Sequence, residues 1–174
     1  MTSSRRSIVL IGFMGTGKSS VGRQLARTTG WPCYDTDQLI ATALGLPITE
    51  IFSTLGEERF RDEESAVIEA LEIDRPSIVV TGGGAVLRAK NVARLRELGT
   101  VVCLTADLAT LRKRLAQHGN RPLLQTENPS ETFEALLRVR EAFYREAADL
   151  TVDTSALNHE QVAETIQDSL ALVG

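Results

Sequence analysis

The sequence of 174 residues contains little cysteine, and no apolar run is long enough to cross a membrane. Its two cysteines, Cys33 and Cys103, match neither a CxxC redox pair nor the spacing of a zinc site. Both stand in apolar runs, so we expect buried free thiols, as in a reducing cytosol. The apolar run near the N-terminus is soon interrupted by glycines and lacks a secretory cleavage pattern. We therefore expect a cytoplasmic protein with no membrane partner.

An excess of positive charge is also missing. The net charge is −4 and the pI is about 5.3, so no global positive field is available to attract nucleic acid or an anionic membrane. Lysine is scarce: Lys18, Lys90 and Lys113 are the three lysines among 19 basic residues. The others are arginines, which suit bidentate recognition of carboxylate and phosphate.

Short β-branched runs alternate with helical patterns along the chain, which predicts a parallel sheet with helices on both faces. We expect each strand to be buried on both faces. The expected strands are Ser7–Ile11, Trp31–Tyr34, Ser77–Thr81, Thr100–Leu104 and Leu150–Asp153. The expected helices are Lys18–Thr28, Asp37–Ala43, Ile48–Thr54, Glu57–Ile73, Asn91–Leu98, Leu108–Gln117, Glu131–Ala148 and His159–Leu172. His118–Ser130 contains two prolines and many turn formers, so it is either a lid or a plain surface connection.

A glycine-rich motif, GFMGTGKS, runs from Gly12 to Ser19 between the first strand and the first helix. This is the P-loop pattern in the context that it requires. Glycines allow the backbone N–H groups to turn inward around a phosphate, Lys18 reaches the β- and γ-phosphates, and the Ser19 hydroxyl is a ligand for Mg²⁺. The residues predicted to bind the nucleotide here are Gly15, Thr16, Gly17, Lys18, Ser19 and Ser20.

The chain lacks the further motifs of nucleotide hydrolases. Neither Asp-x-x-Gly nor Asn-Lys-x-Asp occurs, which argues against a GTPase. The third strand ends in TGGG rather than in acidic residues, which argues against a motor ATPase. A phosphate acceptor other than water is therefore expected.

Several groups after the P-loop suit such an acceptor. Asp35 and Asp37, two residues apart in an expected strand end, could serve a metal or substrate hydroxyls, or else could cap a helix. Arg61 and Glu64 share one helix face, either at a site or as an exposed ion pair. The glycines at 82–84 permit close approach of a ligand to the backbone. Arg140 and Tyr144 also share a face, whereas Arg138 and Arg145 are expected in solvent.

Taken together, the motifs resemble the shikimate kinase family from end to end. They are GFMGTGKSS, DTD, GEERFRDEES, TGGG, RPLL at Arg121–Leu124 and RxxxY at Arg140–Tyr144. The resemblance implies a three-layer α/β P-loop fold like that of nucleoside monophosphate kinases, with five parallel strands in the order 2-3-1-4-5. It implies one domain over residues 1–174, with a lid at about 118–130 and a substrate-binding helical region at about 36–64. A monomer is also expected.

The resemblance further implies transfer of the ATP γ-phosphate to the 3-hydroxyl of shikimate, with Mg²⁺. The implied catalytic residues are Lys18, Asp37 and Arg121, and Arg114 and Arg121 would add to the nucleotide site. Asp37 would hold the ring hydroxyls and take a proton, while Asp35 would join Ser19 around Mg²⁺ through water. The implied substrate-binding residues are Asp37, Arg61, Glu64, Gly82, Gly83, Gly84 and Arg140.

Two features depart from the family pattern. Ala142 and Phe143 replace a usual proline and leucine, which hardly affects Arg140. Asn158 and His159 lie where the family contacts adenine, but His159 could simply begin the last helix. The alternatives are another small-molecule P-loop kinase, such as a gluconate kinase, and an inactive nucleotide-binding domain. The FRxxE and triple-glycine motifs argue against the first, and the intact catalytic set argues against the second.

Overall fold

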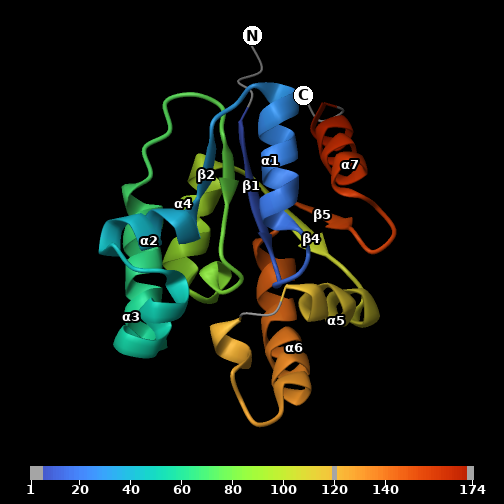
Figure 1. The fold of residues 1–174 in the computed structure, drawn as a ribbon. Coiled ribbons are helices and arrows are strands. Elements are labelled where there is room, and N and C mark those ends of the chain that lie inside the picture. The colour runs from blue at the N-terminus through green and yellow to red at the C-terminus, as the bar shows by residue number, and fades with distance from the viewer. Residues whose placement is uncertain (1–5, 119–120, 172–174) are drawn as a thin grey trace.

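The computed structural model describes residues 6–118 and 121–171. Its elements alternate as the periodicity predicts, and each observed boundary is close to the expected one (Figure 1). The strands are β1 (Ser7–Gly12), β2 (Cys33–Asp35), β3 (Ile78–Val80), β4 (Gly99–Thr105) and β5 (Leu150–Asp153). The helices are α1 (Lys18–Thr29), α2 (Thr36–Leu44), α3 (Ile48–Ala70), α4 (Ala89–Leu98), α5 (Leu108–Gln117), α6 (Pro129–Ala147) and α7 (His159–Ala171), with 3-10 turns η1 (Ala85–Leu87) and η2 (Pro122–Leu124).

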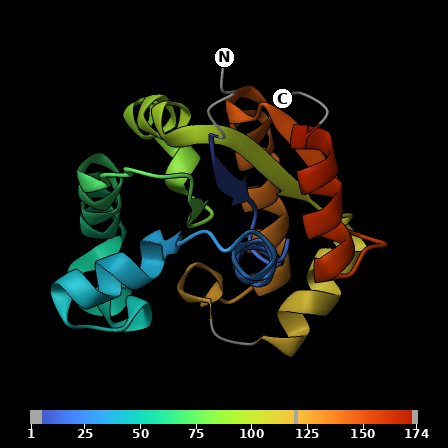
Figure 2. The same ribbon diagram turned by 90° about the horizontal axis from the view of Figure 1, so that it is seen from above.

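The five strands form one parallel sheet in the order β2-β3-β1-β4-β5, which confirms the expected order. Alternate residues of β1 point to opposite faces. Val9 and Ile11 pack in a core beneath α3, α4 and α6, and Ile8 and Leu10 pack in a second core beneath α1 and α7. Seen from above, these two sets of helices lie on opposite sides of the sheet (Figure 2). The fold therefore has the three expected layers.

Burial on both faces was predicted for all strands, and this prediction is wrong for the two edge strands. In β2 the side chains are exposed or half-buried, and Cys33 is an exposed thiol. In β5 only Val152 is buried. An edge strand has one sheet neighbour and is covered less by the helices, and a short apolar run does not reveal its position in the sheet. Cys103, in the inner strand β4, is buried as expected.

α3 combines two helices that were expected separately. Gly56 lies inside it with φ 82° and ψ 168°, so the helix is broken there although its two parts follow each other directly. A side chain at such angles is strained, which is why a glycine occupies the break. A small core of Ile40, Ile51 and Phe60 joins α2 to the two parts of α3. α2 and α3 lie beside the sheet edge formed by β2 (Figure 1).

The expected lid segment contains η2, and α6 begins inside it at Pro129 rather than at Glu131. Proline suits the first helical position because its missing N–H would have no helical partner there. Gly119 and Asn120 of the expected lid lie outside the described residues. Among the helices of the described ranges, none alone is long and apolar enough to span a membrane; only α2 and α3 taken together, bent by 89°, meet such a length and composition test.

Candidate functional site

The P-loop connects β1 to α1 at the carboxyl end of the central strand. Gly15 and Gly17 have φ values of 85° and 93°, which other residues rarely adopt, and Gly17 caps α1. The Lys18 ammonium donates to the carbonyl oxygens of Gly12 at 2.6 Å and Phe13 at 3.0 Å, folding back over the loop. Burial lowers the pKa of Lys18 to about 8, against the opposing attraction of Asp37.

The other polar side chains of the loop differ in exposure. Thr16 is buried, and its hydroxyl donates to the Phe13 carbonyl at 2.8 Å, so this side chain shapes the loop. Ser19 is exposed and Ser20 is half-buried at the start of α1. Their hydroxyls lie at a helix N-terminus, where the free backbone N–H groups favour an anion.

Arg114 ties the P-loop to the segment after β5. Its guanidinium donates to the Gly15 carbonyl at 3.1 Å, to the Thr154 hydroxyl at 2.9 Å and to the Thr154 carbonyl at 2.9 Å. The buried Thr154 hydroxyl donates in turn to the carbonyls of Thr16 and Thr105. Sequence reasoning missed Thr154, because a threonine after a strand carries no motif of its own.

Asn158 and His159 start the last helix. Asn158 and Gln161 exchange hydrogen bonds between side chain and backbone N–H, which is a reciprocal cap. His159 begins α7, which is one of the two expectations for this residue. Its ring also lies near the P-loop, because a Cβ at Gly17 would be 3.7 Å from the His159 Nε2.

The two aspartates of DTD do not lie side by side on an extended strand. Asp35 ends β2 and caps α2: its Oδ1 accepts from the backbone N–H groups of Asp37 at 3.0 Å and Gln38 at 3.3 Å. Asp37 lies in the first helical turn, so the expected extended placement is wrong and the capping alternative is right for Asp35. The cap turns the chain and directs Asp37 inward, to the side of Gly82, because a Cβ there would be 2.8 Å from the Asp37 Oδ1.

Asp37 and Glu64 bring two buried carboxylates to the same glycine. The hypothetical Gly82 Cβ would be 3.0 Å from Glu64 Oε2, and neither this oxygen nor Asp37 Oδ1 has a hydrogen-bond partner in the described structure. Burial raises the pKa of both carboxyls; Asp35 raises that of Asp37 further, and Arg61 opposes the shift at Glu64. Buried polar atoms without partners are costly, and their clustering marks a place for a ligand with hydroxyl donors.

Arg61 and Glu64 form a buried ion pair, so the alternative of an exposed pair is wrong. Arg61 Nη1 is 2.9 Å from Glu64 Oε1, and Arg61 Nη2 is 3.5 Å from Glu57 Oε1. The Arg61 guanidinium also lies against Gly84, where any Cβ would overlap it. A side chain at position 84 would therefore displace the Arg61 guanidinium from its present position.

Arg140 reaches the same glycine segment from α6. It is 3% exposed, and a Cβ at Gly83 would lie 3.4 Å from its Nη1. On the same helix the Tyr144 hydroxyl donates to the Gly83 carbonyl. Burial raises the pKa of Tyr144, and the positive charge of Arg140 opposes this shift. In the described part of the chain Arg140 makes no ion pair with a carboxylate, so a buried positive charge is left for a ligand. Arg138 and Arg145 are exposed, as expected.

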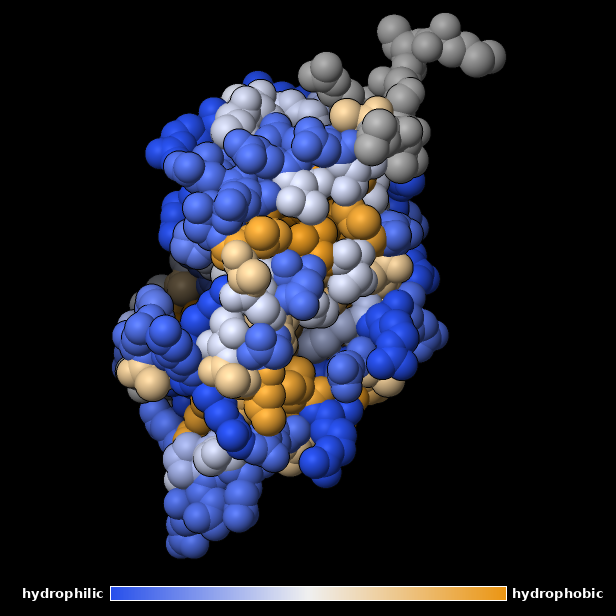
Figure 3. Space-filling model, turned by 90° about the vertical axis from the view of Figure 1, so that its right-hand side faces the viewer, coloured by the Kyte–Doolittle hydropathy of each residue, from blue (hydrophilic) through white to orange (hydrophobic). Residues whose placement is uncertain are grey.

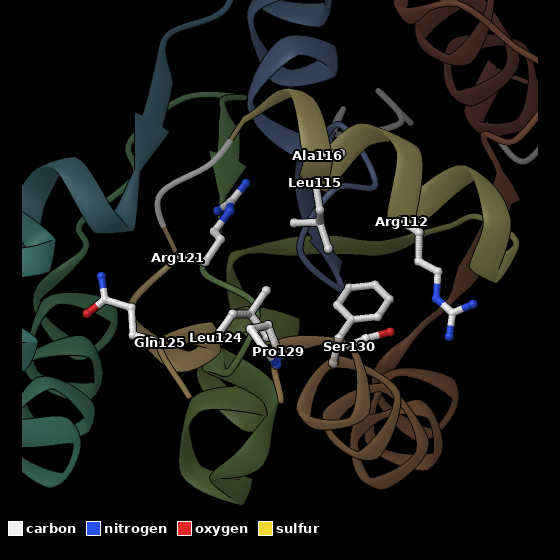
Figure 4. A pocket seen from close by; sticks show the side chains of 9 residues that line it. Arg112, Leu115, Ala116, Arg121, Leu124, Gln125, Pro129 and Ser130 are labelled. Carbon is white, nitrogen blue, oxygen red and sulfur yellow. The ribbon is translucent and has the colours of Figure 1, made fainter. Parts of the chain in front are cut away.

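Arg121 stands on the expected lid segment, at the start of η2, and is exposed. It lines a cavity of about 470 Å³ between the lid, α5 and α6, with Leu115 and Leu124 on its apolar walls (Figure 4). Its charge acts on both Lys18 and Asp37. The expected lid segment thus adds Arg121 to Lys18, Arg61 and Arg140 as a further cation near the carboxylates.

Comparison with known proteins gives a consistent result. A family model described as shikimate kinase matches residues 14–171. The shikimate kinase of Thermodesulfovibrio yellowstonii is 47% identical over 92% of this chain and 92% of its own length. The solved structure of shikimate kinase from Acinetobacter baumannii in complex with shikimate is 36% identical, with a TM-score of 0.91, and covers 97% of this chain and 94% of that one. A gluconokinase from Sinorhizobium meliloti, at 20% identity and TM-score 0.54 over 97% and 93% of the two chains, shares the fold alone.

Proposed function

Because the chain belongs to the shikimate kinase family, we propose that it transfers the γ-phosphate of ATP to the 3-hydroxyl of shikimate, giving shikimate 3-phosphate and ADP. The observation that carries the proposal is the cluster of charged side chains around Gly82–Gly84. There two buried arginines, Arg61 and Arg140, meet two carboxylate oxygens that have no hydrogen-bond partner among the described residues, beside the P-loop. A small acid with several hydroxyl groups would supply a carboxylate for Arg140 and hydrogen-bond donors for the two carboxylate oxygens.

The acceptor would bind with its carboxylate between Arg61 and Arg140 and its ring against the three glycines. Glu64 would hold the Arg61 guanidinium in place through their 2.9 Å contact. Asp37 would accept hydrogen bonds from the ring hydroxyls through its buried oxygen, which has no partner among the residues that the structure describes. Fixing the acceptor in this way converts its attack into a step within one complex, which is a large part of phosphoryl-transfer catalysis.

The donor would lie along the P-loop. Backbone N–H groups of Gly15, Thr16 and Gly17, with Ser19 and Ser20 at the start of α1, would hold the phosphates. Lys18 would exchange its present contacts to Gly12 and Phe13 for the β- and γ-phosphates. The plane of Arg114, held at Gly15 and Thr154, would lie against adenine.

In the transfer, the 3-hydroxyl oxygen forms a bond to the γ-phosphorus while the bond from that phosphorus to the β–γ bridging oxygen breaks. The bridging electron pair leaves with ADP, and the hydroxyl proton passes to Asp37. Lys18 and Arg121 would neutralise the charge on the transferring group. A raised pKa makes the Asp37 carboxylate a better proton acceptor than an ordinary aspartate.

Mg²⁺ fits the residues that are present. The described residues contain no cluster of three or more histidine, cysteine or acidic side chains that could cage a metal. Mg²⁺ is commonly held by one or two protein oxygens together with phosphates and water. Ser19 would bind it directly, and Asp35 through water, since Asp35 Oδ1 already caps α2. When bound, the ion would neutralise negative charge on the phosphates.

A coupled assay of ADP release tests the proposal, with shikimate, gluconate or no acceptor. We expect ADP release when shikimate is the acceptor, and none with gluconate or without an acceptor. Release with gluconate instead would favour the gluconate kinase alternative, release without acceptor would indicate an ATPase, and no release at all would favour an inactive nucleotide-binding domain.

Arg140→Ala tests the acceptor site itself. Loss of a buried bidentate contact costs on the order of 2–4 kcal/mol, so the KM for shikimate should rise about 30-fold or more with little change for ATP. Arg138→Ala is the matched control, because Arg138 is exposed on the same helix. Equal effects of Arg140→Ala on both KM values would remove Arg140 from the acceptor site.

We also propose that residues 1–174 act as one domain and as a monomer. On the side of the molecule that carries α5 and α7, apolar side chains form separate patches among hydrophilic ones rather than one continuous face (Figure 3). Stable dimers usually bury a larger apolar core. The elution volume in size-exclusion chromatography with light scattering should give one chain per particle.

A further inference from the structure

Arg88 follows directly after the glycine segment (82–84) and η1, and its side chain extends from there to α3. Its guanidinium contacts α3, on the other wall of the acceptor pocket. Nη1 donates to the backbone carbonyl of Arg61 at 3.0 Å, to Asp62 Oδ1 at 2.9 Å and to Ser65 Oγ at 3.3 Å. Nη2 donates to Glu58 Oε1 at 2.8 Å. One side chain thus has four acceptors on a single helix.

The four acceptors follow the i, i+3, i+4, i+7 pattern, so they form one face of α3. The turns between Glu58 and Ser65 are also the turns that carry Arg61 and Glu64. The contact to the Arg61 carbonyl is the most informative, because it holds the backbone of the residue whose guanidinium lies against Gly84. Arg88 therefore links the glycine wall of the pocket to the helix wall.

This part of α3 needs such a link. Gly56 breaks the helix just before it, so the segment after residue 56 is not held in line by the first turns of α3. Its position relative to the glycines depends on side-chain contacts. Arginine suits the task because its planar guanidinium can direct several N–H groups at different acceptors at once, which a lysine ammonium does less well.

We propose that Arg88 is a positioning residue for the acceptor site: it fixes the distance between Arg61 on α3 and the glycines at 82–84. This rests on the proposed function, since Arg61 matters to catalysis only if an acid is bound there. Arg88 itself does not touch the acceptor. Its loss should therefore loosen the grip on the carboxylate while leaving the P-loop as it is.

Arg94 provides a matched control. It lies six residues further along the chain, on α4, and its side chain is about as exposed as that of Arg88, 26% against 24%. It also donates to a backbone carbonyl at α3, that of Leu71 at 2.6 Å, and it pairs with one acidic residue, Glu97. Leu71 is at the far end of α3, away from Arg61. Arg94 thus supports α3 without supporting the pocket.

The experiment compares Arg88→Ala, Arg88→Lys and Arg94→Ala with the unsubstituted chain. Measurements are the KM for shikimate, the KM for ATP, kcat and the melting temperature. We expect Arg88→Ala to raise the KM for shikimate about tenfold with less than about a twofold change for ATP. Arg88→Lys should recover part of the loss. Arg94→Ala should lower the melting temperature about as much as Arg88→Ala does, and it should leave both KM values unchanged.

A double substitution separates positioning from general support. Because Arg88 acts through Arg61, adding Arg88→Ala to Arg61→Ala should raise the KM for shikimate no further. Should Arg88→Ala fail to fold, Arg88→Gln replaces it in both comparisons. The inference about Arg88 would be overturned if the Arg88 variants had the same KM for shikimate as the unsubstituted chain. It would also be overturned if the effects of Arg88→Ala and Arg61→Ala were additive. Neither result would affect the proposed function. No phosphorylation of shikimate by the unsubstituted chain would overturn the proposed function and this inference together.

Discussion

At the scale of single residues, the proposed chemistry depends most on a carboxylate that the protein itself leaves unsatisfied. Asp37 is directed inward by the Asp35 cap, and its buried oxygen has no donor in the described structure. A buried charge of this kind lowers stability, and natural sequences retain such groups mainly where function uses them. The same reasoning applies to Arg140, whose buried charge has no carboxylate partner in residues 6–118 and 121–171.

Asp37→Asn should abolish transfer while ATP binding persists. The amide keeps the shape of the side chain but cannot accept the hydroxyl proton, so kcat should fall by about 10²-fold or more. ADP release measures the first effect and calorimetric titration with ATP the second. Asp168→Asn, an exposed position on α7, controls for loss of one negative charge. Near-normal kcat in Asp37→Asn would show that Asp37 is not the proton acceptor.

Lys18 should make ATP binding depend on pH. Its lowered pKa of about 8 means that the free protein loses this proton above that pH, whereas bound phosphates favour the charged ammonium. Above pH 8, ATP binding should take up a proton and weaken with rising pH; near pH 6.5, Lys18 is already charged and contributes no uptake. Calorimetry in two buffers of different ionisation enthalpy measures the uptake. Equal proton uptake at both pH values would exclude Lys18 as its source.

At the scale of elements, the break in α3 decides where the proposed substrate-binding helices lie. Gly56 adopts positive φ with nothing within 4 Å of a hypothetical Cβ, so its requirement comes from the backbone alone. Two helical patterns on either side of a glycine were predicted, and the break is confirmed. We did not predict that the second part of α3 follows directly after the first, or that Arg88 contacts it.

Gly56→Ala should lower the free energy of unfolding by about 1–3 kcal/mol, the usual cost of such a backbone conformation for a non-glycine residue. Urea denaturation measures it. Gly45→Asn is the matched control, because Gly45 at the end of α2 has φ 65° and ψ 22°, a region that asparagine tolerates. Equal losses in the two variants would show that position 56 is not specially strained.

At the scale of the whole molecule, the sheet brings together segments that are far apart in the chain. β1 and β3 are neighbours, so the P-loop and the triple glycine follow them at the same edge of the sheet. α6 places Arg140 next to Gly83 at this edge. The lid adds Arg121 from a separate segment. A lid that closes on bound substrates excludes water, which would otherwise compete as the phosphate acceptor.

Arg121→Ala should lower kcat by about 10²-fold or more with a modest effect on the KM for shikimate, because a lid arginine acts mostly on charge in the transition state. Steady-state kinetics with both substrates checks this. Lys113→Ala, an exposed position on α5, tests whether any cation nearby has the same effect. An unchanged kcat in Arg121→Ala would remove Arg121 from catalysis.

Local chemistry in the sequence was enough for the P-loop, the strand and helix segments and the break at Gly56, because each depends on neighbours a few residues away. The strand order came from family resemblance rather than from periodicity. Asp37 could be singled out but its placement could not, since an Asp-Thr-Asp segment suits both a strand end and a helix cap.

The sequence by itself determined the nucleotide-binding motif, the alternation of strands and helices, and which charged residues were available for an acceptor. Only the tertiary structure decided which of those charges are buried and which have partners. Arg61 is paired with Glu64, and Arg140 has no carboxylate partner within the described part of the chain. The structure likewise decided that Cys33 is exposed. It also revealed Arg88 and Thr154, whose contacts reach 23 residues or more along the chain. Burial and long-range pairing depend on how the layers pack, and no local pattern encodes that packing.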